Sequence, residues 1–120
     1  MANAALLMEW GMPRQGREHK ALEVFFASMA QWEGWKAAGK IESFEVFGTL
    51  TGNYESRSGF LIARGTSAQI TALQESEEFR QALVKVITIG NDVRLTNLET
   101  GDAMASRMQR YATTLKTLGV

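Results

Sequence analysis

Residues 17–50 constrain the fold most strongly, because a helix-like pattern runs through a glycine directly into a strand-like pattern. In the first part, large apolar residues recur at the three- and four-residue steps of a helix face. These residues are Leu22, Phe25, Phe26, Met29 and Trp32. Gly39 suits the left-handed position that ends a helix, and at Gly34 the helix could kink or end early. Residues 41–47 have strand spacing, so the segment predicts a helix packed on a sheet.

Two hydrophobic stretches predict further strands next to this segment. Residues 4–11 carry apolar side chains on both faces, which is typical of a central strand. Gly52 and Asn53 predict a two-residue hairpin turn, which fixes the pairing of the strands around it. The resulting pairs are Thr51 with Tyr54, Val46 with Gly59, and Phe44 with Leu61. On the other face, residues 43, 45 and 47 share a surface with residues 60, 62 and 64.

Residues 66–89 predict two successive helices. The first carries Ile70 and Leu73, and the second starts near Ser76, whose side chain can cap it. The β-branched run at 84–89 also permits a strand, but the helical spacing that starts at Phe79 favours a helix. Residues 93–98 then predict a fourth strand.

The last pattern is an amphipathic helix over residues 102–118 with Asp102 as its N-cap. Its apolar residues repeat in alternating steps of four and three, as in a helix that packs on another surface. They are Met104, Met108, Tyr111, Leu115 and Leu118. That surface belongs either to the same domain or to a partner subunit. We therefore expect one domain over residues 1–120, with a core at 4–101 and an added helix at 102–118.

Composition excludes several classes of function. Thirteen basic residues balance thirteen acidic ones, so no overall field favours a nucleic acid. The chain has no cysteine, which excludes disulfides, thiolate metal sites and a cysteine nucleophile. No apolar run approaches the roughly 18 residues of a membrane span, and no signal sequence is recognisable, so we expect a cytoplasmic protein. Phosphate-binding glycine loops and a GxSxG nucleophile motif are also absent.

The order strand, helix, strand, strand, helix, strand predicts an α+β fold of the ferredoxin-like type, with an antiparallel sheet and an extra C-terminal helix. The helices of such a fold cover one face of the sheet. The other face would expose an apolar area that a second copy could cover. It includes Leu7, Phe47, Phe60, Ile62 and Leu98.

Two stretches carry a resemblance to known proteins: WKAAGKIESFEVFGTL, which leads from helix to strand, and ALQESEEFRQAL in the second helical region. With this element order, residues 4–101 resemble the dimeric α/β-barrel superfamily, which includes antibiotic-biosynthesis monooxygenases, EthD-like proteins and small stress-responsive barrel proteins. The resemblance implies a homodimer, and our leading hypothesis is that this dimer binds a small apolar or aromatic organic molecule between the helices and the sheet. It also implies possible activities, namely cofactor-independent oxygenation, isomerisation or cyclisation. The alternative is a non-enzymatic assembly or regulatory module whose sheet face is filled by its partner subunit.

The face opposite the predicted helices combines charged and aromatic residues. Buried arginines there could orient an acidic or carbonyl-bearing ligand, while burial would raise the pKa of a glutamate that acts as a base. Structural ion pairs are the alternative interpretation. The ligand-binding candidates are Glu9, Glu45, Phe47, Phe60, Arg64 and Arg94.

His19 is the sole histidine, so one chain cannot form a multi-histidine metal site. It could act as a haem ligand or a general base, but its sequence position favours a solvated helix surface and a pair with Glu23. We therefore predict no metal and no required cofactor. The aromatic residues Trp10, Trp32, Trp35 and Tyr54 could stack on an aromatic ligand or serve as core.

Overall fold

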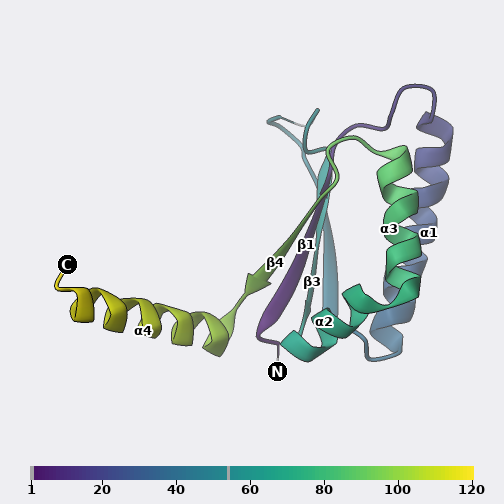
Figure 1. Ribbon diagram of the computed structural model, residues 1–120. Helices are drawn as coiled ribbons and strands as arrows, with labels where there is room; N and C mark the ends of the chain where they lie inside the picture. The colour runs from purple at the N-terminus through teal and green to yellow at the C-terminus, as the bar shows by residue number, and fades with distance from the viewer. Residues whose placement is uncertain (1, 54) are drawn as a thin grey trace.

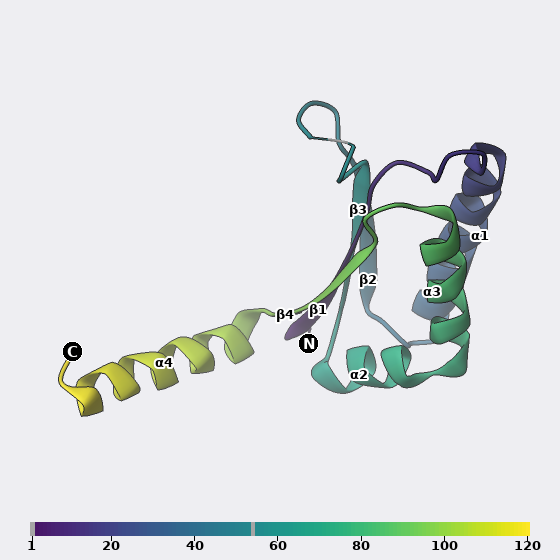
Figure 2. The same ribbon diagram turned by 45° about the horizontal axis from the view of Figure 1, so that its top comes forward.

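The computed structural model describes residues 2–53 and 55–120. Its elements are β1 (Ala4–Trp10), α1 (Glu18–Ala37), β2 (Ser43–Gly48), β3 (Gly59–Gly65), α2 (Ser67–Glu75), α3 (Glu77–Ile89), β4 (Arg94–Glu99) and α4 (Gly101–Leu118). This order confirms the predicted ferredoxin-like fold with an added C-terminal helix. The strands form one antiparallel sheet in the order β2-β3-β1-β4. Helices α1, α2 and α3 lie on one side of it (Figures 1 and 2).

Strand β1 is central, as its apolar pattern predicted, because it pairs with both β3 and β4. Leu6 and Met8 of this strand face the helices and are buried in the core. The core is shared between one face of the sheet and the helices that cover it, and burial of this apolar area stabilises the fold. Its buried members are Leu6, Met8, Trp32, Trp35, Ile41, Leu61, Ala63, Ile70, Leu73 and Phe79.

The predicted hairpin register was wrong by two residues. Phe44 lies opposite Ala63, and Val46 lies opposite Leu61. The two strands are joined by a longer connection, which is closed by bonds from Thr49 N to the Ser58 carbonyl at 2.9 Å and from Thr49 Oγ1 to the Arg57 carbonyl at 2.7 Å. The predicted pair of residues 51 and 54 involves a position outside the described residues. Because the shift is even, each side chain keeps its predicted face, and Phe47 lies opposite Phe60.

The helices follow the local signals. Helix α1 continues through Gly34, and Gly39 has the left-handed φ of +75° predicted for the residue after the helix. Thr66 and Gln69 form a reciprocal capping box at α2. Ser76 accepts a bond from the backbone N–H of Phe79 and caps α3. Residues 84–89 belong to α3, so the helix interpretation was correct.

Helix α1 packs closely on the core only through its second half. Trp32 and Trp35 are buried, whereas the side chains of Leu22 and Phe26 are 60% and 62% exposed. The sequence placed Phe26 on the helix face that packs on the sheet, and this prediction was wrong. Equal helical spacing does not ensure equal burial, because the first half of the helix stands away from the sheet. This leaves a space that the candidate site occupies.

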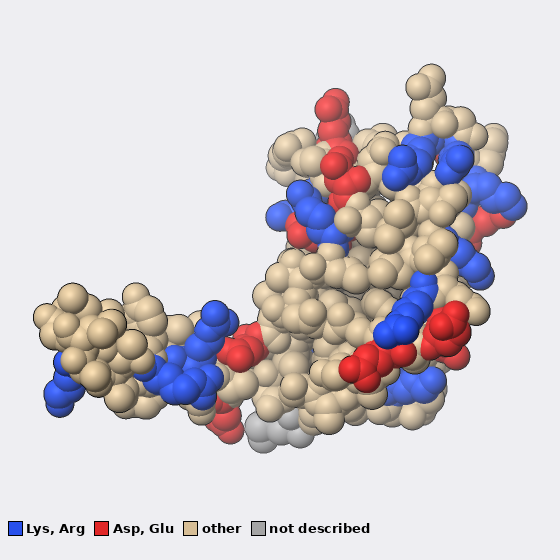
Figure 3. Space-filling model, in the orientation of Figure 1, with Lys and Arg blue, Asp and Glu red and all other residues tan. Residues whose placement is uncertain are grey.

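Helix α4 begins at Gly101, and Thr100 is its N-cap residue, so the N-cap prediction for Asp102 was wrong. Asp102 instead lies in the first turn, where a carboxylate interacts favourably with the helix dipole. The helix extends away from the body as a separate lobe (Figure 3). The radius of gyration is consequently 16.9 Å, whereas a compact chain of this length has about 14 Å. Among the described helices, none has the length and apolar character needed to cross a membrane.

Candidate functional site

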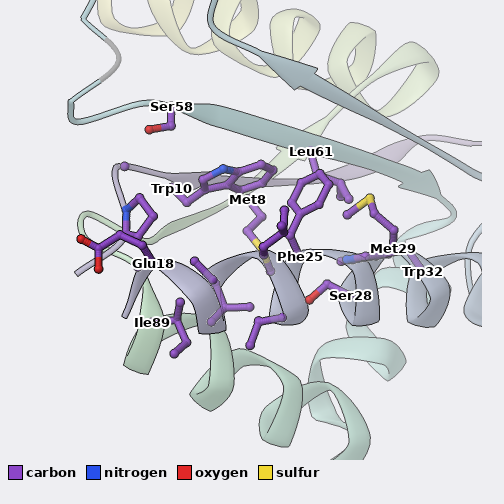
Figure 4. A pocket seen from close by; sticks show the side chains of 17 residues that line it. Met8, Trp10, Glu18, Phe25, Ser28, Met29, Trp32, Ser58, Leu61 and Ile89 are labelled. Atoms are coloured by element: carbon purple, nitrogen blue, oxygen red, sulfur yellow. The ribbon is translucent and has the colours of Figure 1, made fainter. Parts of the chain in front are cut away.

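A cavity of about 300 Å³ lies between the first half of α1, the end of β1 and the end of α3 (Figure 4). It is on the side of the sheet that the helices cover. Its walls are mostly apolar and contain aromatic, aliphatic and methionine side chains. The lining residues are Met8, Trp10, Gly11, Pro13, Glu18, Ala21, Leu22, Val24, Phe25, Ser28, Met29, Trp32, Ser58, Leu61, Val86, Ile89 and Gly90.

Two aromatic side chains, Trp10 and Phe25, form one wall of the cavity. Their ring centroids are 6.3 Å apart in an edge-to-face arrangement, which suits the quadrupoles of aromatic rings. The place of the Trp10 ring depends on Gly59, the residue paired with it on β3. A β-carbon at Gly59 would lie 2.9 Å from Cζ2 of Trp10 and 2.8 Å from the carbonyl oxygen of Phe47. The glycine therefore makes room for the tryptophan that shapes the site.

The opposite end of the cavity is closed by Trp32, which belongs to an aromatic cluster in the core. Its ring lies 4.8 Å from that of Trp35 and 6.3 Å from that of Phe79, both edge to face. The indole N–H of Trp35 donates a hydrogen bond to the Glu78 carboxylate, so its polar atom has a partner. Because Trp32 is buried and braced on several sides, this wall is fixed rather than adaptable.

The segment before α1 fastens the mouth of the cavity to α3. Arg14 donates its backbone N–H to the Ile89 carbonyl at 2.7 Å and its Nε–H to the Ile87 carbonyl at 3.2 Å. Arg17 Nη1 donates to the Thr88 carbonyl at 2.5 Å. These carbonyls belong to the last turn of α3, where a helix leaves acceptors unsatisfied. The two arginines therefore hold the start of α1 beside the end of α3.

Polar side chains are few in the lining. Ser28 and Ser58 supply hydroxyl groups, and Glu18 supplies the one carboxylate among the lining residues. Glu18 is exposed to solvent at the start of α1. A cavity with this lining favours a largely apolar ligand, because a buried polar ligand group would find few hydrogen-bond partners.

The charged candidates from the sequence lie on the opposite face of the sheet. The Glu9 side chain is 9% exposed, and its Oε2 atom lies 2.6 Å from Arg57 Nε and 3.7 Å from Arg94 Nη2. The closer contact is an ion pair without the alignment of a hydrogen bond. The Arg57 guanidinium also lies 5.7 Å from the centroid of the Phe60 ring, which stacks on Phe47 at 4.8 Å. The structure thus brings together four of the six candidates, Glu9, Phe47, Phe60 and Arg94, which form a charged cluster with Arg57.

Glu45 and Arg64 do not join this cluster. Glu45 is exposed and lies opposite Ile62, while Arg64 is exposed and lies opposite Ser43. None of the six candidates lines the cavity, because alternate residues of a strand point to opposite faces. On β1, Met8 and Trp10 line the cavity, whereas Glu9 points away from it. The ligand-binding role of these six residues therefore stays a prediction.

Sequence reasoning found part of the cavity and missed one member of the charged cluster. Trp10 and Trp32, which the sequence suggested for stacking, both line the cavity. Trp35 lies in the core, and the predicted role of residue 54 falls outside the described residues. Arg57 was missed because the short hairpin would have put it within the strand, on the helix side. The longer loop instead brings it to Glu9.

His19 is exposed near the start of α1 and does not line the cavity. Its expected partner Glu23 forms an ion pair with Lys20 at 3.0 Å instead. Across residues 2–53 and 55–120 there is no cluster of side chains that could hold a metal ion. The haem alternative thus stays a prediction, without support from the position of His19.

Comparison with known proteins identifies the fold. No protein-family model and no curated protein matches the chain. Among solved structures, a dimeric ferredoxin-like protein of unknown function from Jannaschia sp. CCS1 is similar at a TM-score of 0.64 and 16% identity, covering 81% of this chain and 98% of that one. A dimeric ferredoxin-like protein of unknown function from Bacteroides fragilis has a TM-score of 0.63 and 11% identity, covering 81% and 95%.

A third similar structure is from Deinococcus radiodurans and is described as a candidate antibiotic biosynthesis monooxygenase. Its TM-score is 0.56 at 13% identity, and the match covers 85% of this chain and 94% of that one. These structures confirm the ferredoxin-like fold and its likeness to dimeric proteins of this class. At such low identity they establish the fold alone.

Proposed function

We propose that this protein is a homodimer that binds a small apolar or aromatic organic molecule in the cavity between α1 and the sheet. The observation that carries the proposal is the cavity of about 300 Å³ with its largely apolar lining. Ligand sites in proteins have volumes of about 300–1,000 Å³. A flat ring could stack against Trp10 or Phe25, while Ser28 could offer one hydrogen bond to a polar substituent.

The lining also limits the chemistry that could follow binding. Glu18 is the one carboxylate among the lining residues, and no histidine, lysine or arginine lines the cavity in the described part of the chain. A proton abstraction, as in an isomerisation or a cofactor-independent oxygenation, would therefore depend on Glu18 at the mouth. The similar structure from Deinococcus radiodurans supports an oxygenase activity only through the name given to that protein. We accordingly propose binding as the primary function.

The dimer would form through the sheet face that the helices leave open. This face carries the stacked pair Phe47 and Phe60, and it also includes Leu7, Ile62 and Leu98. The dimeric state of similar structures supports this arrangement. The cavity and the open face lie on opposite sides of the sheet, so dimer formation would leave the cavity accessible. The alternative, an assembly or regulatory module, would use the same face but needs no cavity.

The binding proposal can be tested by filling the cavity. Ser28→Phe places a phenyl ring in the lining, whereas Ala27→Phe places the same ring at an exposed position of α1. Small aromatic probes such as naphthalene and indole would be titrated into each protein and followed by calorimetry and tryptophan fluorescence. We expect binding by the wild type and Ala27→Phe and at least a tenfold loss in Ser28→Phe. Equal affinities in all three proteins, or no binding by the wild type, would contradict the proposal.

A further inference from the structure

Helix α4 presents an apolar stripe that the described residues of its own subunit leave largely uncovered. The helix has 18 residues, and none of them is buried. Its stripe consists of Met104, Met108, Tyr111, Leu115 and Leu118. In proteins, most of the stability of a helix comes from packing of its apolar face against other parts of the structure. The stripe therefore requires another apolar surface to pack against.

The direction of α4 indicates where the surface that covers its stripe lies. Helix α4 leaves the end of β4 on the side of the sheet opposite to α1 and α3, and it extends away from the body (Figures 1 and 2). An ion pair of 3.7 Å between Arg107 Nη1 and Glu99 Oε2 connects its second turn to the end of β4. Leu98, which belongs to the open sheet face, lies three residues before the helix. The apolar stripe thus continues an apolar surface that already faces away from the helical layer.

We infer that α4 is an exchanged arm, whose stripe packs on residues 4–99 of a second copy of this chain. The inference rests on the homodimer proposed above, in which two open sheet faces meet. Stacked sheets lie about 10 Å apart, whereas a helix of 18 residues is about 27 Å long. An arm that projects from the open face is therefore long enough to pass the partner's sheet and reach its helical layer.

The area of the interface supports the same arrangement. Four strands of six or seven residues cover about 400 Å² in flat projection, an area smaller than their solvent-accessible surface. A stable interface buries about 800 Å² on each partner. Each copy gives one arm and receives one, and at about 27 Å by 10 Å per contact the two arms add about 500 Å² to each copy. In projection, the sheet faces alone cover less area than a standard interface, and the exchanged arms enlarge the contact.

Two paired substitutions test the arm in the full chain. Met108→Glu with Leu115→Glu places two charges in the stripe, and Ser106→Glu with Thr113→Glu places the same charges at the same spacing outside it. We expect the first variant to weaken dimerisation at least 100-fold in analytical ultracentrifugation and the second to change it less than threefold. Equal dissociation constants for the two variants would overturn the inference that α4 is an exchanged arm, but they would leave the proposal of a sheet-face dimer intact. A monomeric wild type would overturn both.

Cross-linking locates the arm directly. The native chain has no cysteine, so Ala112→Cys provides a single attachment point for a photoreactive maleimide beside the stripe. Dimers are assembled from copies that carry the maleimide and from ¹⁵N-enriched copies that do not. The isotope then distinguishes links within a copy from links between copies. We expect links from residue 112 of one copy to residues 4–99 of the other. Links within one copy, links between the two α4 helices, or no links would each overturn the inference.

Discussion

Replacing Gly59 by alanine should destabilise the protein and displace a wall of the cavity. A β-carbon at this position would lie 2.8 Å from the carbonyl oxygen of Phe47 and 2.9 Å from Cζ2 of Trp10. The carbonyl is part of the paired β2 backbone and cannot yield easily, so the Trp10 ring must move as well. Overpacking of this kind costs about 1–3 kcal/mol. We therefore expect Gly59→Ala to lower the free energy of unfolding by about 2 kcal/mol.

The chain provides a matched control at the paired position on β2. Gly48 lies directly opposite Gly59, but a β-carbon there would meet no atom within 4 Å. Gly48→Ala should be neutral or stabilise the protein by up to about 1 kcal/mol, because alanine restricts the unfolded chain. The two variants therefore separate a steric effect at Gly59 from the general effect of a glycine replacement in a strand.

Urea unfolding followed by circular dichroism measures both variants. Protein concentration must be equal in all samples, because dissociation of a dimer contributes to its apparent stability. We expect the urea midpoint of Gly59→Ala to lie about 1 M below that of the wild type, at an unchanged slope. Binding of an aromatic probe should also weaken in Gly59→Ala and stay unchanged in Gly48→Ala. Equal midpoints for the two variants would refute the steric reasoning.

Two further pairs of substitutions test the capping of the helices and the charged cluster. Ser76→Ala removes the side chain that caps α3, so urea unfolding should show a loss of about 1 kcal/mol. Thr100 makes no capping bond, and Thr100→Ala should cost less than about 0.5 kcal/mol. A larger loss of stability in Thr100→Ala than in Ser76→Ala would contradict the assignment of Ser76 as the capping side chain. Arg57→Ala removes the closer partner of Glu9 and should cost about 1–2 kcal/mol, more than Arg94→Ala. Neither arginine variant should change probe affinity, and a fall in affinity would place the ligand on the open face.

Much of the fold follows from patterns that act over short distances. The two faces of β1 could be assigned because Leu6 and Met8 alternate with Leu7 and Glu9. Gly39, which follows the end of α1, and Ser76, which caps the start of α3, are themselves signals of a helix end and a helix start. Each of these features depends on only a few neighbouring residues, so the sequence states them directly.

The hairpin shows where such local signals fail. A Gly-Asn pair favours a two-residue turn, but backbone and side-chain bonds between Thr49 and residues 57 and 58 stabilise a longer loop. The strand faces were nevertheless predicted correctly, because an even shift in register preserves the alternation. The same error concealed Arg57, whose contact with Glu9 depends on the real path of the loop.

The cavity could be only partly predicted for a different reason. The spacing of Leu22, Phe26 and Trp32 places them in one apolar series, yet Trp32 is buried and the other two are mostly exposed. Helical periodicity indicates which residues are apolar, but the distance between a helix and the sheet depends on the packing of the whole domain. Sequence reasoning therefore placed a ligand between helices and sheet while naming residues on the opposite face.

Native mass spectrometry of the freshly purified protein tests the central claim most directly, because it reports subunit number and retained small molecules together. We expect a dimer of two 13.3 kDa chains that carries a small organic molecule, and loss of that molecule in Ser28→Phe but not in Ala27→Phe. A dimer without any ligand would favour the assembly or regulatory module. A ligand-free monomer would contradict both the dimer and the binding function.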